Sequence, residues 1–540
     1  MLVDCLDGSE VAAAVYQYAN GVIDQRLPDS DVELEPEWAL QDPADYVRTL
    51  QHVVPEVLVL AGVRPEEVGG VGIDFTSCTM LPTAADGTPL CELPELRGRP
   101  HAWVKLWKHH AAQPEADEVN AVAQERGEPW LPRYGGKISS EWFFPKALQI
   151  LHEDPEVYVR ADRLIEAADW IVWQLTGVET RNNCTAGYKA IWSRAAGFPS
   201  AEYFGALDPR FAGVVDEKMS RSIVSIGRRA GRLTERAAAW TGLRPGTPVA
   251  VANVDAHVSA PAVGGIEPGT VVVIMGTSNC HILLGERLAE VEGMCGVVED
   301  GVVPGLLGYE AGQSAVGDIF AWFVANAVPP QIHELARREG SDVHRVLEEE
   351  AAGLAAGESG LLVLDWWNGN RSVLVDAGLS GCVVGLELAT RPAELYRALL
   401  EATAFGTRVI IDAFERESVS VDRIVACGGL PHRNRLLVQI YADVLGRTIE
   451  VSSSQQAPAL GAAMFGALAG GAFGSIREAS ERMAAPIAET YLPDHGKRRA
   501  YDELYAEYVR LHDLFGRGGD DVMKTLKRLR AEARRAVVPS

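Results

Sequence analysis

Hydrophobic and polar positions in the first half of the chain predict short strands followed by helices. Residues 2–18 (LVDCLDGSEVAAAVYQY) indicate a strand, an Asp-Gly turn and a second strand. A helix is predicted around residues 43–60, and residues 68–90 predict a buried strand, a polar bend at 74–79 and another strand. Residues 140–245 are predicted to be mainly helical, with one amphipathic helix (EAADWIVWQLTG) that ends at Gly177.

The same order of elements begins again near residue 247. Residues 247–257 predict a strand that ends in an acid, and residues 270–284 predict two strands joined by Gly-Thr-Ser-Asn. Helices are predicted at 314–328 and 457–470, a strand that runs into a helix at 423–445, and a short strand at 448–454. Strand hairpins followed by helices in both halves predict an α/β protein with two related domains and a cleft between them.

We therefore expect one domain at residues 1–246, a second at residues 247–490, and a helical tail at residues 491–540. The basic stretch at residues 524–535 is interpreted as a solvated terminal helix, with a binding arm as the alternative. A length of 540 residues agrees with two large domains, because single hydrophobic cores stop growing below that size.

Composition narrows the class of protein. The chain is 47% hydrophobic and 23% charged, and it has no apolar run long enough to span a bilayer. A formal charge of −24 argues against nucleic-acid binding, which needs a basic surface, but it does not argue against a nucleotide ligand. The eight cysteines are dispersed without metal-ligand spacing, so we predict reduced thiols and a cytoplasmic protein.

Candidate chemistry lies at three strand ends in the second half. Asp255 ends an apolar strand, where it either caps the next helix or faces a ligand. The bend MGTSN contains Gly276 and Thr277, and such a bend either exposes backbone N–H groups to phosphate oxygens or is an ordinary hairpin turn. In CGGLPHRN, Gly429 allows close backbone approach, and Asn434 either caps a helix or faces a ligand.

Taken together and in this order, these motifs resemble those of the FGGY carbohydrate kinases, which belong to the actin-like ATPase superfamily. The resemblance runs from about residue 70 to residue 465 and is highly specific, because many separate motifs occur in the family's order. The stretches that carry it are VGIDFTSCTMLP, HAWVKLWKHHAA, YGGKISSEWFFPK, CTAGYKAIW, NVDAHVSAPAVG, VIMGTSNCHILL, GYEAGQSAVGDIFAWF, LDWWNGNRS, EATAFGTR and CGGLPHRN. It implies two ribonuclease H-like domains with a catalytic cleft between them.

The resemblance also implies the roles of individual residues on the sugar side. Asp255 is expected to be the general base that accepts the proton of the attacking sugar hydroxyl. Ser77, Lys189, Glu310 and Asp255 itself are expected to contact the sugar. The alternatives are an ion pair between domains for Lys189 and a helix-capping carboxylate for Glu310. Trp107 either stacks on the sugar or packs in the core.

On the nucleotide side, the resemblance implies ATP as the phosphoryl donor. Gly276 and Thr277 are expected to bind phosphates, Gly317 to lie at the start of the neighbouring helix, and Gly429 with Asn434 to bind the nucleoside. Mg²⁺ is expected to bridge the β- and γ-phosphates largely through water, so no protein metal ligand is predicted.

Three features leave the picture open. Asp74 is a candidate partner of the Mg²⁺ shell but not a ligand. The family begins with a strand and an Asp-x-Gly-Thr/Ser phosphate turn that are absent before LVDC. We therefore expect a start site assigned too far downstream and a poorly active or poorly folded chain. His109 replaces an acid found in many members, which leaves open the hydroxyls read by that loop.

Three functions follow from these expectations. The leading one is ATP-dependent phosphorylation of L-ribulose at its terminal hydroxyl, as in arabinose catabolism. The second keeps the reaction but changes the acceptor to xylulose, ribitol or another polyol, and the third is an actin-like ATPase without a small-molecule acceptor. The expected partners are a small-molecule sugar and ATP, with no nucleic acid and no membrane. The oligomeric state is open, with a homodimer as one alternative.

Overall fold

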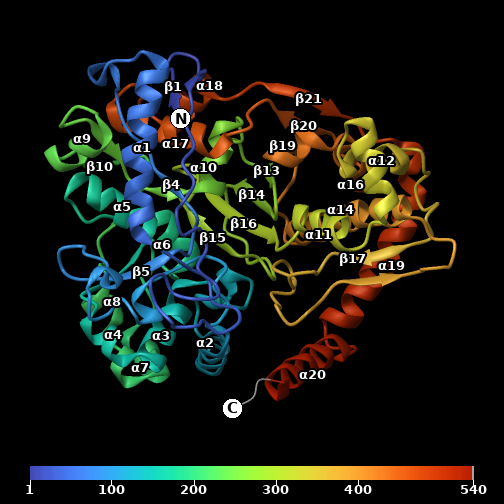
Figure 1. The fold of residues 1–540 in the computed structure, drawn as a ribbon, viewed down its shortest axis with the longest axis horizontal. Helices are drawn as coiled ribbons and strands as arrows, with labels where there is room; N and C mark the ends of the chain where they lie inside the picture. Colours follow the sequence, from blue (N-terminus) through green and yellow to red (C-terminus); the bar gives the residue numbers. More distant parts are fainter. Residues whose placement is uncertain (538–540) are drawn as a thin grey trace.

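The computed structural model describes residues 1–537, which form two α/β halves side by side (Figure 1). The blue and teal elements of the N-terminal half lie on one side and most yellow and orange elements of the C-terminal half on the other, whereas α17 (Ala457–Gly470) and α18 (Ile476–Met483) lie beside β1 (Leu2–Val3) on the N-terminal side. The two-domain α/β class predicted from the sequence is confirmed. Within residues 1–537, no helix combines the length and the apolarity needed to cross a membrane.

The C-terminal half is built on a seven-stranded sheet. The strand order is β15-β16-β14-β13-β19-β20-β21, in which β13, β14, β16 and β15 are antiparallel neighbours while β13, β19 and β20 run parallel. This is the order of a ribonuclease H-like domain with added edge strands. The strands are β13 (Thr270–Met275), β14 (Asn279–Gly285), β15 (Gly296–Glu299), β16 (Leu307–Gln313), β19 (Arg423–Cys427), β20 (Ile449–Ser452) and β21 (Ile487–Tyr491).

Helices cover both faces of this sheet, because successive side chains of the apolar run TVVVIM point to opposite sides. Val271 and Val273 pack in one core cluster with helices α14 and α16, whereas Val272 packs in another with α10 and α17. The helices are α10 (Asp255–Ala262), α11 (Gly317–Asn326), α12 (Pro330–Glu339), α13 (Val343–Ala352), α14 (Pro392–Arg416), α15 (Gly429–Arg433), α16 (Arg435–Leu445), α17 (Ala457–Gly470) and α18 (Ile476–Met483). The short pair β17 (Leu362–Leu364) and β18 (Cys382–Val384) lies outside the sheet.

Strands of the N-terminal half are shorter and belong to several small sheets. One has the order β3-β6-β5-β7, and β1–β2, β4–β12, β10–β11 and β8–β9 form pairs. The strands are β1 (Leu2–Val3), β2 (Glu10–Ala12), β3 (Leu40–Gln41), β4 (Asp74–Phe75), β5 (Met80–Thr83), β6 (Val104–Lys105), β7 (Arg163–Glu166), β8 (Arg181–Asn182), β9 (Ile223–Val224), β10 (Arg229–Arg232), β11 (Pro248–Ala250) and β12 (Asn253–Val254). The hairpin predicted at the start of the chain is therefore present as β1–β2.

Helices complete the N-terminal half, and beyond residue 140 they make up most of it, as predicted. They are α1 (Pro43–Ala61), α2 (Gln113–Arg126), α3 (Phe143–Glu153), α4 (Pro155–Arg160), α5 (Ala167–Thr176), α6 (Asn183–Lys189), α7 (Ala201–Leu207), α8 (Val214–Lys218) and α9 (Glu235–Thr241). The amphipathic helix α5 ends at Gly177, whose φ of 70° is the left-handed conformation that favours glycine.

Both expected domain boundaries, after residues 246 and 490, fall within packed structure. Strands β11 and β12 follow the expected boundary at residue 246, yet they pair with β10 and β4 of the N-terminal half. In the expected tail, α19 (Arg498–Gly516) buries Tyr501 and Tyr508 in the core of the C-terminal half. In Figure 1, α20 (Val522–Val537) lies at the lower edge of the molecule, and its start packs against the C-terminal half through Met523 and the Lys524–Asp376 ion pair. Residues 538–540 of the expected tail lie outside the described residues.

Candidate active site

Asp255 lies where the N-terminal half passes into the C-terminal half. It is the first residue of α10, directly after β12, and β12 runs parallel to β4 with Asn253 opposite Asp74. The Asp255 carboxylate accepts a hydrogen bond from the backbone N–H of Ala256 at 2.6 Å. Burial and the nearby carboxylate of Asp74 raise the pKa of Asp255 to about 7. A carboxyl group with this pKa is suited to exchange a proton at neutral pH.

Lys189 and Glu310 form a buried ion pair that joins the two halves. Lys189 is the last residue of α6, and Glu310 lies on β16 of the large sheet. The Lys189 ammonium donates a hydrogen bond to the Glu310 carboxylate at 2.7 Å, and His257 Nε2 lies 3.4 Å from the other carboxylate oxygen. Although burial alone would raise it, the pKa of Glu310 falls to about 2, chiefly because Lys189 is adjacent. The pair therefore stays charged across the physiological pH range.

Helix α6 is held in place by polar contacts at its first turn. Asn182 caps the helix by accepting a hydrogen bond from the backbone N–H of Thr185 at 2.7 Å, and its side-chain amide donates to Asp169 at 2.8 Å. The opposite end of this short helix presents Lys189 to Glu310. The ion pair between halves, which was an alternative for Lys189, and a place beside Asp255 are thus both found for the same residue.

The other predicted sugar contacts lie in loops of the N-terminal half. Ser77 is half-buried in the bend between β4 and β5, next to Cys78, whose φ is 58° and whose carbonyl accepts a hydrogen bond from Lys146 at 2.7 Å. Trp107 is half-buried after β6, and the Arg371 guanidinium lies 5.7 Å from its ring centroid. Trp107 is therefore neither a fully buried core residue nor free in solvent.

The three predicted nucleotide loops meet at the ends of β13 and β19, which are parallel neighbours. The Gly276 carbonyl accepts a hydrogen bond from Gly317 N–H at 3.1 Å, and a Cβ atom on Gly317 would lie 2.7 Å from that carbonyl oxygen. Gly428 has a φ of 94°, and a Cβ there would lie 2.5 Å from the carbonyl oxygen of Met275. Only glycine fits at such contacts, so the glycines bring the loops together.

Open space lies above parts of these loops. Thr277 and Gly429 are exposed, and a Cβ atom built on Gly429 would meet nothing within 4 Å. Asn434, in contrast, is buried. Its side-chain oxygen caps α16 by accepting from the N–H of Leu437 at 2.8 Å, and its amide donates to the Tyr396 hydroxyl at 3.2 Å. The capping alternative that the sequence left open for Asn434 is therefore realised.

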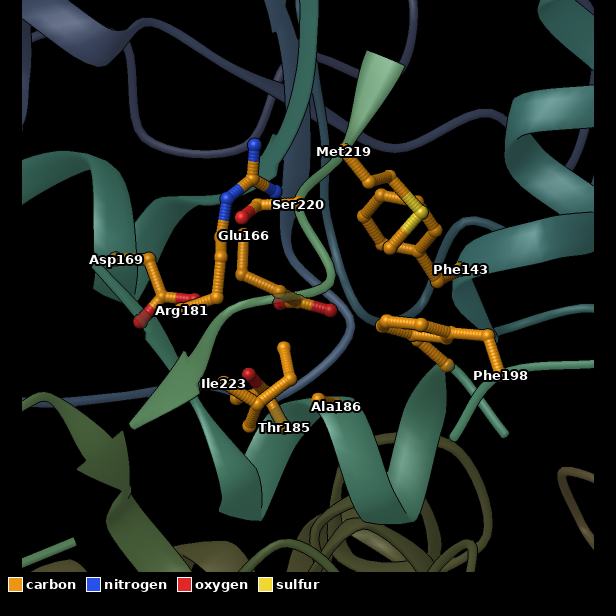
Figure 2. A pocket seen from close by; sticks show the side chains of 11 residues that line it. Phe143, Glu166, Asp169, Arg181, Thr185, Ala186, Phe198, Met219, Ser220 and Ile223 are labelled. Atoms are coloured by element: carbon orange, nitrogen blue, oxygen red, sulfur yellow. The ribbon is translucent and has the colours of Figure 1, made fainter. Parts of the chain in front are cut away.

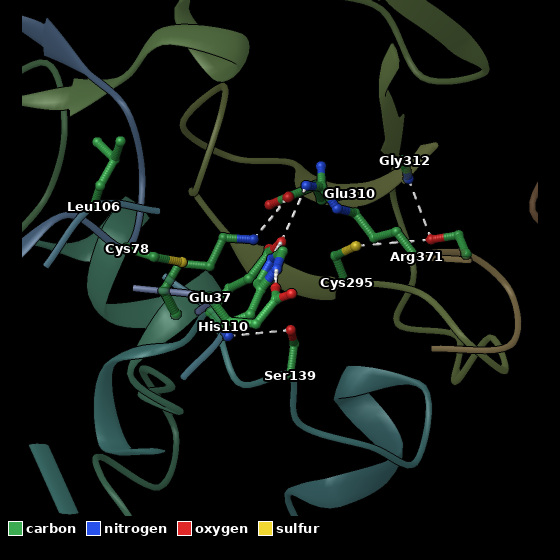
Figure 3. A network of polar contacts seen from close by, with 12 residues as sticks. Glu37, Cys78, Leu106, His110, Ser139, Cys295, Glu310, Gly312 and Arg371 are labelled. Atoms are coloured by element: carbon green, nitrogen blue, oxygen red, sulfur yellow. Dashed lines mark hydrogen bonds and ion pairs between the residues drawn. The ribbon is translucent and has the colours of Figure 1, made fainter. Parts of the chain in front are cut away.

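Sequence reasoning missed a charged network beside the Lys189–Glu310 pair. Figure 3 shows Glu37, His110 and Arg371 gathered near Glu310, and Glu141 connects them through contacts to His110 and Arg371. The signal was present, since HAWVKLWKHHAA, YGGKISSEWFFPK and LDWWNGNRS each supply one member. His109, which the sequence motif singled out, is buried and accepts a hydrogen bond from Ala39 N–H at 3.2 Å.

A separate small pocket lies against α6, away from Lys189. Its wall includes Thr185 and Ala186, and Figure 2 shows the Glu166 carboxylate between Arg181 and the ring of Phe198. Both oxygens of Glu166 lack a hydrogen-bond partner, and burial raises its pKa to about 8. None of the predicted sugar or nucleotide residues lines this pocket.

Several known proteins are similar to this chain over most of its length. The C-terminal domain of the FGGY family of carbohydrate kinases matches residues 271–470. The ribulokinase of Anoxybacillus flavithermus is 57% identical over 538 residues, which cover 99% of this chain and 95% of that protein. The ribulokinase of Geobacillus thermodenitrificans is 57% identical over 540 residues, which cover 99% and 96%. The crystal structure of xylulose kinase from Rhodospirillum rubrum gives a TM-score of 0.72 at 25% identity and covers 89% of this chain and 91% of that one.

The fold and the comparisons define a two-domain sugar kinase of the actin-like ATPase superfamily. The chain belongs to the FGGY family of carbohydrate kinases, as the sequence motifs predicted. It is thus an enzyme that transfers a phosphoryl group from ATP to an alcohol group of a sugar.

Proposed function

We propose that this kinase phosphorylates the terminal hydroxyl of L-ribulose and serves arabinose catabolism. The observation that carries the proposal is the near full-length likeness, at 57% identity, to two proteins named ribulokinase. The alternative acceptor is xylulose, which the name of the structural relative at 25% identity favours. A reduced interior with eight free cysteines supports a cytoplasmic location. A homodimer is the oligomeric state we propose to test, by measuring the mass of the enzyme in solution.

The residues on the sugar side support a simple division of roles. Lys189 donates to and Glu310 accepts from sugar hydroxyls, because the two side chains offer opposite hydrogen-bonding chemistry at one place. Asp255, with a pKa of about 7, accepts the proton of the hydroxyl as its oxygen attacks the γ-phosphorus. Ser77 and Trp107 complete the proposed sugar contacts from the N-terminal half.

The nucleotide side is proposed to lie over the three converging loops. The exposed bend at Thr277, next to Gly276, would hold phosphate oxygens. Gly429, with open space above it, leaves room for the nucleoside, and Gly317 sets the start of α11 beside the bend. We propose that Asn434 acts here by capping α16 at this edge, since both ends of its amide are already bonded.

Mg²⁺ is proposed to accompany ATP. In residues 1–537 no group of three or more His, Cys, Asp or Glu side chains could hold a metal ion, so the ion would be held mainly by phosphate and water. Asp74 and Asp255 are the carboxylates that would face it, and burial raises the pKa of both. When bound, Mg²⁺ neutralises phosphate charge.

The acceptor is tested with a panel of L-ribulose, D-xylulose, D-ribulose and ribitol in a coupled assay of ADP release. We expect the highest kcat/KM with L-ribulose, and L-ribulose 5-phosphate as the product identified by mass spectrometry. A higher kcat/KM with xylulose or ribitol would replace the proposed acceptor. ATP turnover that no sugar changes would contradict the whole proposal.

Asp74 offers a test of the base through its pKa. The Asp255 carboxylate must be ionised to accept a proton, so kcat/KM for the sugar falls as the pH drops through the pKa of Asp255. Asp74→Asn removes a repelling charge, so we expect the acidic limb to move to lower pH by about one unit. Asp86→Asn, in an exposed turn, is the matched control and leaves the limb in place. An unmoved limb in Asp74→Asn would refute this assignment.

A further inference from the structure

Four ionisable side chains form a continuous line beside the Lys189–Glu310 pair. His110 Nδ1 lies 3.5 Å from the Glu37 carboxylate, and His110 Nε2 lies 3.0 Å from a carboxylate oxygen of Glu141. The same oxygen of Glu141 lies 3.4 Å from the Arg371 guanidinium. Glu37, His110 and Glu141 belong to the N-terminal half, whereas Arg371 belongs to the C-terminal half. The Glu141–Arg371 contact therefore joins the two halves.

Arg371 makes a second contact across the same boundary. Its guanidinium lies 5.7 Å from the ring centroid of Trp107, within the range of a cation–π interaction. Its aliphatic stem lies against Gly312, where a Cβ atom would approach the Arg371 Cδ to 3.1 Å. Gly312 follows Glu310 by two positions on β16, so Arg371 touches the strand that carries the sugar-side carboxylate.

Glu141 is tied to the other side of the ion pair. It precedes Trp142 in the chain, and the ring centroid of Trp142 lies 5.3 Å from the Lys189 ammonium. The Glu141–Arg371 contact therefore connects the segment that carries Trp142, which lies against Lys189, to the guanidinium that lies against Trp107.

The charges of these four side chains favour the contact between Glu141 and Arg371. The Glu141 and Arg371 side chains are each 16% exposed, so solvent screens their attraction weakly. Despite burial, hydrogen bonds to Glu141 and Glu37 raise the pKa of His110 to about 9, so His110 is a cation at neutral pH. Arg371 and His110 keep the pKa of Glu141 well below its usual range. Glu141 thus carries a full charge between two cations.

We propose that Arg371, held between Glu141 and Trp107, is a positioning residue that joins the two halves at the sugar end of the site and sets the affinity for the sugar. The proposal rests on the proposed function of this site. Arg371 acts through Trp107 and the Glu141–Trp142 segment, and it does not touch the reacting hydroxyl or the phosphates. Its loss is therefore expected to change KM for the sugar far more than kcat or KM for ATP.

The test uses Arg371→Gln, Glu141→Gln and the double variant, each assayed with the best acceptor of the unsubstituted enzyme. We expect KM for the sugar to rise about tenfold or more in each single variant, while kcat and KM for ATP change by less than about threefold. The double variant is expected to have a KM for the sugar no higher than that of the more impaired single variant, because both substitutions break the same contact. Arg371→Lys, which keeps the charge but loses the planar fork, is expected to restore part of the affinity.

The matched control is Arg194→Gln. Arg194 also pairs across the halves, with Glu299 and Asp300, but its side chain is 47% exposed, whereas that of Arg371 is 16% exposed. Sugar KM within about twofold of the parent is expected for this control.

The proposal is overturned if Arg371→Gln leaves the sugar KM unchanged, if the two single effects add, or if KM for ATP rises equally. Should Arg371→Gln fail to fold, Glu141→Gln and Arg371→Lys decide by the same criteria. If L-ribulose is not the acceptor, the sugar panel shows this in the parent enzyme. If Arg371 has no positioning role, only the variants show it.

Discussion

Replacing Lys189 by methionine is expected to lower the free energy of unfolding by about 3–5 kcal/mol and to abolish measurable saturation with the sugar. Methionine keeps the length of the side chain but leaves the Glu310 carboxylate in the interior without its cation, 3.4 Å from His257. A buried charge that has lost its partner is costly, and the sugar loses a donor at the same time. Denaturant unfolding measures the first effect, and initial rates against sugar concentration measure the second.

The stability that the Lys189–Glu310 pair contributes to the fold depends on pH. In the parent enzyme the pKa of Glu310 is lowered to about 2, so the stability that this carboxylate contributes is present above its unfolded pKa and is lost as the pH falls towards 2. Lys189→Met removes the cause of that shift. The stability gap between parent and variant is therefore largest at neutral pH, and it shrinks as the pH falls through the pKa of Glu310 in the variant, which burial without a cation raises above the ordinary value.

Two further variants separate stability from sugar binding. Arg397 and Glu401 form an equally buried pair at 2.8 Å within the C-terminal half, so Arg397→Met should destabilise the fold and leave the sugar KM alone. The double variant Lys189→Met with Glu310→Gln should recover part of the stability, since no buried charge remains, but no sugar affinity. Full sugar affinity in Lys189→Met would contradict the role given to this pair.

Local patterns in the sequence were enough to predict the strands and the nucleotide loops. The β-branched run of β13, the Gly-Thr-Ser-Asn bend and the Gly-Gly turn after β19 each combine residues within a few positions of one another. Their physical requirements, buried faces and close backbone approach, are readable from residue type. For the same reason the predicted helix at 457–470 coincides with α17.

Contacts between distant residues were out of reach of the same reasoning. Lys189 and Glu310 are 121 positions apart, and Glu141 and Arg371 are 230 apart. The neighbouring residues His109 and His110 show that even within one loop the contact partners could not be predicted. His109 turns inward to Gln149, and His110 turns to Glu141. The direction of the backbone after β6 decides between them, and no periodic pattern in that short loop records it.

Asp255→Asn is expected to lower kcat for sugar phosphorylation by about 10²–10⁴, the usual contribution of a positioned general base. Asparagine has nearly the same shape and still accepts the hydrogen bond from Ala256 N–H, but it cannot take a proton. Positioning by the Lys189–Glu310 pair and by the nucleotide loops remains, so KM for ATP should change little. Thermal unfolding is the check that the fold is intact, and removal of a carboxylate that burial disfavours should not lower the midpoint.

We propose that Asp255 removes the proton from the sugar hydroxyl as the phosphoryl group is transferred. The decisive experiment compares the rate of L-ribulose 5-phosphate formation by Asp255→Asn with that of the unsubstituted chain, with both substrates saturating at pH 8. We expect a rate at least about 100-fold lower. Sugar phosphate formed at the parental rate by Asp255→Asn would contradict it.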